Sequence, residues 1–94
     1  MNNEKASWTF LSNHSHVLIC LARDPGLRMR DIADQVGITE RAVQRIVKEL
    51  CEAGVLQTNK EGRRNFYHLQ KGIHLRHPLE SHRTVNDLLK AVKP

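Results

Sequence analysis

The sequence predicts a small, mainly α-helical domain with one β-hairpin. Three observations support this fold class. Apolar residues recur at helical spacing from Glu40 to Ala53, a shorter helical stripe precedes them and stops at Gly37, and two β-prone runs flank the polar segment 59–64. A chain of 94 residues is expected to form one domain with a modest core, so burial against a second subunit would add stability.

The N-terminal part of the chain predicts an arm followed by a helix. The helix spans 13–23, with Ser12 or Asn13 as its N-cap, and the Asp-Pro-Gly segment that follows ends it. Trp8 and Phe10 lie just before this helix. Because aromatic residues beside a helix of a small domain are usually buried, we expect them to anchor the arm by apolar contacts. Stacking on nucleic-acid bases is the alternative.

Two further helices are predicted over 29–36 and 40–53, joined by a tight turn. The first of them has no good N-cap, whereas the Thr39 hydroxyl can accept a hydrogen bond from the first turn of the second. Gly54 supplies the left-handed residue that commonly ends a helix. The apolar stripe of the second helix consists of Val43, Ile46, Val47 and Leu50. Two helices joined in this way form a helix-turn-helix, whose second helix can enter the DNA major groove.

The face opposite this apolar stripe is polar and basic. It presents Arg41, Gln44, Arg45 and Lys48 at the same helical spacing. A solvated surface is the simpler interpretation of such a face, but the preceding helix and turn favour a contact with nucleic acid. The formal net charge of +5 is concentrated after the first helix, which also favours a polyanionic partner.

A β-hairpin is predicted from strands over 55–59 and 64–69. On the second strand Tyr67 and Leu69 share one face, and we expect this pair to be buried. The tip carries Lys60, Arg63 and Arg64. A basic tip beside a helix-turn-helix is well placed to contact phosphates or enter the minor groove, although a tip that only aids solubility is the alternative.

The C-terminal segment is predicted to form a helix over 79–92, with Pro78 in its first turn. Its apolar stripe consists of Leu79, Val85, Leu88, Leu89 and Val92. We divide the chain into the helix-turn-helix and hairpin with their N-terminal arm, residues 1–77, and a dimerisation helix, residues 78–94, as parts of one domain. The stripe favours dimerisation. Packing against the first helix is the alternative, and the two arrangements are compatible.

Three motifs occur in a fixed order along the chain: DIADQVGIT, RAVQRIVKELCEAGVL and EGRRNFYHL. With these motifs, the run from Leu27 to Leu69 resembles the winged helix-turn-helix DNA-binding domain of prokaryotic transcription regulators of the MarR and ArsR type. The resemblance implies a three-helix core, a hairpin that serves as the wing, and a short strand at 27–28 that pairs with the wing. It also implies repression or activation of promoters by a dimer.

The expected function is that of a sequence-specific regulator that binds double-stranded DNA, a dimeric repressor that reads a near-palindromic operator. The residues expected at the DNA are Thr39, Glu40, Arg41, Gln44, Arg45, Lys48, Lys60, Arg63 and Arg64. Those expected at the interface of a homodimer are Trp8, Phe10, Leu79, Val85, Leu88, Leu89 and Val92. A winged helix that binds only proteins is the main alternative, but such modules usually lose the cations that this third helix keeps.

Other chemistry has little support in the sequence. There is no nucleophile-elbow motif and no glycine-rich phosphate loop, so we expect no enzyme and no cofactor. His74, His77 and His82 suggest a metal-responsive repressor as a further alternative, but they lack acidic neighbours at chelating spacing. Two cysteines in helical apolar patterns, with no membrane span or signal peptide, favour a cytoplasmic protein. The sequence indicates no particular effector.

Overall fold

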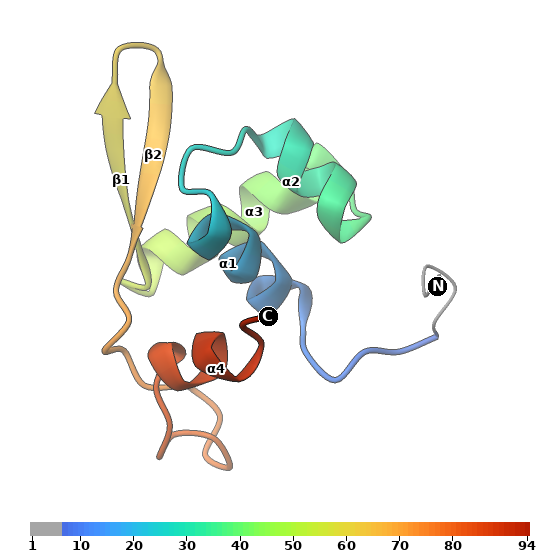
Figure 1. Ribbon diagram of the computed structural model, residues 1–94, viewed down its shortest axis with the longest axis vertical. Helices are drawn as coiled ribbons and strands as arrows, with labels where there is room; N and C mark the ends of the chain where they lie inside the picture. The colour runs from blue at the N-terminus through green and yellow to red at the C-terminus, as the bar shows by residue number, and fades with distance from the viewer. Residues whose placement is uncertain (1–6) are drawn as a thin grey trace.

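The computed structural model describes residues 7–94. Three helices pack together, a two-stranded hairpin projects from them, and a short helix follows near the C-terminus (Figure 1). The elements are α1 (Asn13–Arg23), α2 (Met29–Val36), α3 (Glu40–Glu52), β1 (Leu56–Glu61), β2 (Arg64–Leu69) and α4 (Val85–Ala91). The predicted fold class is confirmed. Within the described part of the chain, no helix is long and apolar enough to cross a membrane.

The ends of the first three helices follow from local side-chain chemistry. The Ser12 hydroxyl caps α1, and the Thr39 hydroxyl caps α3 by accepting a hydrogen bond of 3.0 Å from the Ala42 N–H. The N-cap of α2 is Arg28, whose side chain forms no capping bond, as predicted. Gly37 closes α2 in the left-handed region, with a φ of 85° that only glycine adopts without cost. These ends fix the tight turn between α2 and α3.

A single apolar core joins the helices to the base of the hairpin. The predicted stripe of α3 is buried, together with Val17, Leu18 and Leu21 of α1, Ile32 and Ala33 of α2, Val55, Leu56 and Tyr67. Leu69 is half-buried against this core, so the predicted inward pair of the second strand is confirmed. Because α3 is buried along one side only, its other side is held at the surface in a fixed orientation.

The hairpin is antiparallel, with a register that runs from Leu56 opposite Leu69 to Glu61 opposite Arg64. A two-residue turn at 62–63 connects the strands, and Gly62 has a φ of 64° at its first position. A glycine at this position allows a turn that matches the twist of the strands. The first strand therefore continues to residue 61, two residues beyond the prediction, and starts one residue later than predicted.

The predicted strand at 27–28 is absent, and the sheet of the described residues has only two strands. The turn that ends α1 is closed by a hydrogen bond from the Leu27 N–H to the Asp24 carbonyl, so this N–H does not take part in a strand ladder with the wing. One backbone bond links the two segments, from the Tyr67 N–H to the Pro25 carbonyl at 3.2 Å. A single such bond does not make a strand ladder.

Side chains complete the link between this turn and the wing. Arg64 donates to the Gly26 carbonyl, and its guanidinium lies over the Phe66 ring, 5.5 Å from the ring centre. The same ring lies so close to Gly26 that a Cβ added there would approach it to 2.7 Å. The wing is therefore held against the α1–α2 turn by contacts that require a glycine.

The C-terminal helix is shorter than predicted, because residues 78–82 form turns and α4 begins after Thr84. A capping box starts it: the Thr84 hydroxyl accepts from the Asp87 N–H, and the Asp87 carboxylate accepts from the Thr84 N–H. The bond from the Thr84 N–H is the main reason that the pKa of Asp87 lies below its usual value. Pro78 lies in the preceding turns, so its predicted place in the first helical turn is wrong.

This correction divides the predicted C-terminal stripe. Leu79 lies outside the helix with 81% of its surface exposed, whereas Val85 is 3% exposed and belongs to the common core. Leu88, Leu89 and Val92 are half-buried. Leu79 and Val85 therefore do not lie on one helical face, although the sequence had suggested that they do.

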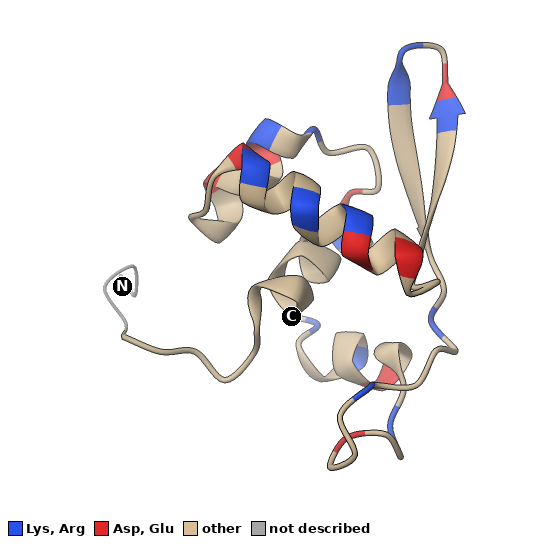
Figure 2. Cartoon of the chain, turned by 180° about the vertical axis from the view of Figure 1, so that it is seen from behind, with Lys and Arg blue, Asp and Glu red and all other residues tan. Residues whose placement is uncertain are grey.

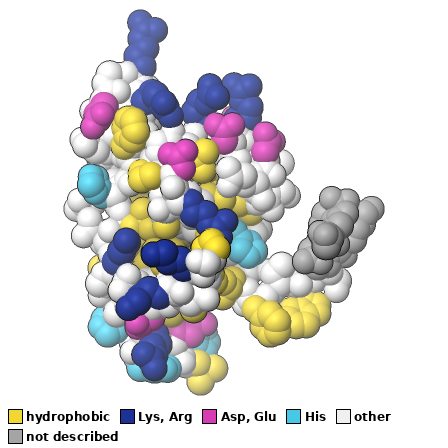
Figure 3. Space-filling model, viewed as in Figure 1, with side chains coloured by type: hydrophobic (Ala, Val, Ile, Leu, Met, Phe, Trp, Pro, Cys, Tyr) yellow, Lys and Arg dark blue, Asp and Glu magenta, His cyan; other side chains and the backbone are white. Residues whose placement is uncertain are grey.

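The aromatic residues of the arm are not buried in the single chain. Trp8 is 66% and Phe10 91% exposed, and the two rings contact each other edge to face with their centres 4.8 Å apart. Figure 3 shows hydrophobic side chains of the arm standing away from the body. We expected the body of the same chain to cover these rings. This expectation is wrong, because the segment that precedes Asn13 extends away from the packed helices (Figure 1).

Candidate nucleic-acid interface

The exposed side of α3 carries the predicted polar face. Arg41, Gln44, Arg45 and Lys48 are all exposed, while the residues between them are buried or half-buried. In Figure 2 the basic segments follow one another along α3, with the wing and its basic tip to one side. The helix thus presents three cations and one amide on a rigid support.

The first turn of α3 adds two further predicted residues. The oxygen of Thr39 accepts the capping bond, which leaves its hydroxyl hydrogen free to donate to a phosphate. Glu40 is exposed in the first turn, where the helix dipole stabilises an anion. Both residues lie at the surface beside Arg41.

The wing places its three predicted cations differently. Lys60 and Arg63 are exposed near the tip, and within residues 7–94 neither forms an ion pair. Arg64 is exposed as well, but its guanidinium is bound to the Gly26 carbonyl and stacked on Phe66. Arg64 therefore has a structural role, because it links the wing to the α1–α2 turn. The sequence pattern did not indicate this role.

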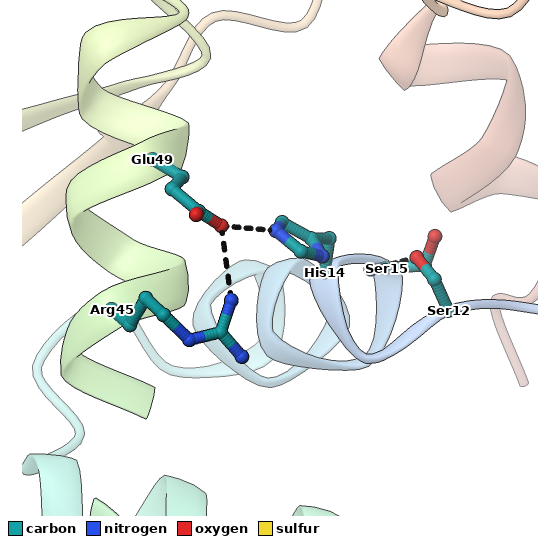
Figure 4. Close-up of polar contacts among 5 residues, drawn as sticks. All are labelled: Ser12, His14, Ser15, Arg45 and Glu49. Carbon is teal, nitrogen blue, oxygen red and sulfur yellow. Dashed lines mark hydrogen bonds and ion pairs between the residues drawn. The ribbon is translucent and has the colours of Figure 1, made fainter. Parts of the chain in front are cut away.

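A carboxylate adjoins the basic face of α3. Figure 4 shows Glu49 between Arg45 of the same helix and His14 of α1. His14 Nε2 donates to Glu49 Oε1 at 2.7 Å, and Arg45 Nη1 donates to the same oxygen at 3.4 Å. The bond from His14, helped by the charge of Arg45, lowers the pKa of Glu49. This cluster was missed, because His14 lies 35 residues away in the sequence.

Two further cations at the start of α2 were not predicted as part of the interface. Arg28 and Arg30 are both exposed. Arg28 Nε donates to Asp31 at 3.3 Å, whereas Arg30 forms no ion pair among the described residues. The sequence contained a signal for these cations, since the helix that precedes the predicted recognition helix begins Met-Arg-Asp.

Two of the three histidines considered as metal ligands form hydrogen bonds within their loop. His74 Nδ1 is 2.8 Å from the Ser81 carbonyl, and His77 Nδ1 accepts from the Leu79 N–H at 3.0 Å. Within residues 7–94, no group of three or more histidine, cysteine or acidic side chains is placed to hold a metal ion.

The thiol of Cys20 is buried, which raises its pKa and disfavours the reactive thiolate.

A comparison with protein-family models found one matching family for the central part of this chain. Residues 12–57 match the family described as winged helix-turn-helix DNA-binding. The fold of the described residues is that of a winged helix-turn-helix. The matched segment runs from the N-cap of α1 through α3 into β1, so it contains the helix-turn-helix and all residues of its exposed α3 face. A search of curated proteins found no match.

Solved structures relate this domain to the MarR regulators. The PcaV transcriptional regulator from Streptomyces coelicolor, in complex with its natural ligand, is 28% identical with a TM-score of 0.55, over 64% of this chain and 45% of that one. The zinc-dependent MarR family regulator AdcR, in its Zn(II)-bound state, is 27% identical with a TM-score of 0.50, over 68% and 46%. The expected resemblance to MarR-type regulators is confirmed.

A third structure supports the fold alone. ZitR from Lactococcus lactis, a zinc-responsive MarR family member, is 22% identical with a TM-score of 0.53, over 74% of this chain and 50% of that one. The present chain thus spans about half the length of each of these three proteins.

Proposed function

We propose that this chain is a sequence-specific transcription regulator that binds double-stranded DNA. The observation that carries the proposal is the exposed face of α3, which presents cations and an amide while its opposite face is locked in the core. A helix of this kind fits the major groove, and its orientation costs no reorganisation on binding. The wing cations beside it can reach the flanking backbone.

The side chains divide by the chemistry that they offer. Arg41 and Gln44 lie toward the start of α3, where recognition helices contact base edges, and each can bond one base through two atoms. The proposed phosphate contacts are Thr39, Arg45, Lys48, Lys60 and Arg63. Arg64 already donates to the Gly26 carbonyl, so it is proposed to contact phosphate only through its remaining N–H donors. Glu40 is proposed to accept from an amino group of cytosine.

Selection of bound sequences from a random pool of duplex DNA tests this function. A regulator of this kind should enrich one motif, and its affinity for that motif should fall steeply with salt. A winged helix that binds only proteins should enrich none. An absence of enrichment together with salt-independent weak binding contradicts the proposal.

Phosphate contacts give a separate prediction. Lys48→Ala and Arg63→Ala should each weaken binding to all sequences alike and lower the slope of log affinity against log salt by about 1. Lys71→Ala is the matched control, because Lys71 is an exposed cation outside α3 and the wing. Fluorescence anisotropy over a series of salt concentrations provides the measurement. Equal slopes for the control and the two variants exclude these contacts.

A dimer is proposed because one helix reads only a few base pairs. Two recognition helices about one DNA turn, ~34 Å, apart would read a near-palindromic operator, at which we propose that the protein acts as a repressor. Available apolar groups include the exposed Trp8 and Phe10 and the half-buried Leu88, Leu89 and Val92. Val85 is already used by the core of its own chain. Leu79 is exposed in a turn, and its part in an interface stays a prediction.

Light scattering should therefore report about twice the chain mass of 10.8 kDa at micromolar concentration. Replacing both Trp8 and Phe10 by alanine should shift the protein toward the monomer, because it removes the two most exposed rings of the arm. Thr9→Ala on the same arm removes no apolar ring and serves as the control. A protein that stays monomeric and selects an asymmetric site contradicts the dimer.

A further inference from the structure

The Arg45 guanidinium, a proposed phosphate contact, already has an anionic neighbour. Glu49 Oε1 lies 3.4 Å from Arg45 Nη1, one helical turn further along α3. In an isolated helix, an acid that follows a base by four residues forms a weaker pair than the reverse order. The helix alone therefore does not account for the placement of this carboxylate.

A second helix supplies the missing support. His14 of α1 donates to the same Glu49 oxygen at the shorter distance of 2.7 Å (Figure 4). Because one oxygen serves both donors, a stronger bond to His14 leaves less negative charge for Arg45. His14 and Glu49 line a surface hollow whose other charged side chains are Glu52 and Arg76. Neither of these two forms an ion pair within residues 7–94.

The electrostatic consequence concerns DNA. A phosphate that approaches Arg45 must share its guanidinium with Glu49, and the carboxylate also repels the phosphate. All three side chains are 44–60% exposed, so water screens these effects but does not abolish them. Glu49 should thus lower the affinity of α3 for any DNA backbone, independently of the base sequence.

We propose that Glu49 is a positioning residue that holds the Arg45 guanidinium and limits the affinity of α3 for DNA, while His14 weakens this hold by binding the same oxygen. The inference rests on the proposed function. It adds a negative determinant to a face that otherwise consists of attractive contacts. It also links DNA affinity to α1, the helix from which the N-terminal arm extends.

The first test compares two isosteric charge removals on one helix. Glu49→Gln should raise the affinity for duplex DNA of unrelated sequences about two- to fivefold, the range of one exposed charge pair. Glu52→Gln removes the same charge one turn nearer the end of α3, but no ion pair with Arg45. It should change the affinity by less than half as much. Equal effects of the two variants overturn the proposal, since net charge alone would explain them.

Double variants show whether Arg45 carries the effect. In an Arg45→Ala background, Glu49→Gln should raise the affinity no more than Glu52→Gln does. An undiminished effect in that background would mean that the carboxylate repels DNA directly, which overturns the role of Arg45. His14→Ala should lower the affinity about twofold by leaving Glu49 to Arg45. His14→Gln keeps a donor and should restore the affinity.

A measurement without DNA separates this inference from the proposed function. Followed by NMR titration, the pKa of Glu49 should lie below its usual value and rise toward it in His14→Ala, because the bond from His14 is the main cause of the shift. A pKa that does not respond to His14 overturns the contact itself. If the contact is present but the unchanged chain binds no DNA, the proposed function and this inference both fail.

Discussion

Replacement of Gly26 by alanine should lower the free energy of unfolding by about 1–3 kcal/mol, the usual cost of overfilling a packed site. Gly26 is buried, and its added Cβ would lie 2.7 Å from the Phe66 ring and 3.4 Å from the Arg64 guanidinium. The ring has to move, and the guanidinium that stacks on it has to follow. The substitution should therefore loosen the wing from the α1–α2 turn.

Thermal and urea unfolding of the variant measure this loss. Gly72→Ala is the matched control, because its added Cβ would meet nothing within 4 Å and its backbone does not need glycine. A second variant identifies the clash: Phe66→Ala should cost stability alone but reduce the additional cost of Gly26→Ala. If Gly26→Ala and Gly72→Ala are equally stable, the contact between the turn and the wing is not close-packed.

The same variant should reduce DNA binding for a second reason. A wing that is free to move must be ordered when its cations meet the backbone, and that ordering opposes binding. At a temperature where Gly26→Ala is fully folded, its affinity for DNA should be lower than that of Gly72→Ala. This difference would show that the turn positions the wing for binding and does not only stabilise the fold.

Most of the helical core could be predicted because its signals are local. The Thr39 cap, the Gly37 stop and the apolar stripe of α3 all lie within a few residues of the structure that they specify. The wing strands were placed to within two residues for the same reason. Their burial pattern followed from the alternation at Tyr67.

The errors arose where the outcome depends on competing or distant contacts. The apolar spacing from Leu79 suggested one long helix, but Thr84 and Asp87 form a capping box that starts the helix later. That box was readable in the sequence as a threonine followed three residues later by an acid. The strand at 27–28 came from the family resemblance alone, and here the turn after α1 replaces it.

In the candidate site, too, the features set by local signals were predicted and those set by distant contacts were not. The exposed face of α3 followed from helical periodicity, since burial of one stripe places the opposite stripe in solvent. The bond between His14 and Glu49 joins two helices, and no spacing rule relates residues so far apart. Likewise, nothing local indicated that Arg64 would bind the Gly26 carbonyl instead of remaining free at the wing.

The largest effect on sequence discrimination is expected when Arg41 and Gln44 are both replaced by alanine. Each can bond a single base through two atoms, worth about 1–3 kcal/mol of discrimination. The double variant should therefore bind its selected site at least tenfold less tightly relative to unrelated DNA. Both side chains are exposed on a helix whose packing lies on the opposite face, so the fold should keep its stability.

Two comparisons distinguish base readout from charge. Arg41→Lys keeps the positive charge but loses the planar fork that matches guanine, so it should reduce discrimination nearly as much as Arg41→Ala. Lys48→Ala should weaken the selected and unrelated sites equally, because a phosphate contact carries no sequence information. A repeated selection gives the decisive result. If the double variant still enriches the same motif as the unchanged protein, α3 reads DNA through other residues, and the assignment of Arg41 and Gln44 to base edges is wrong.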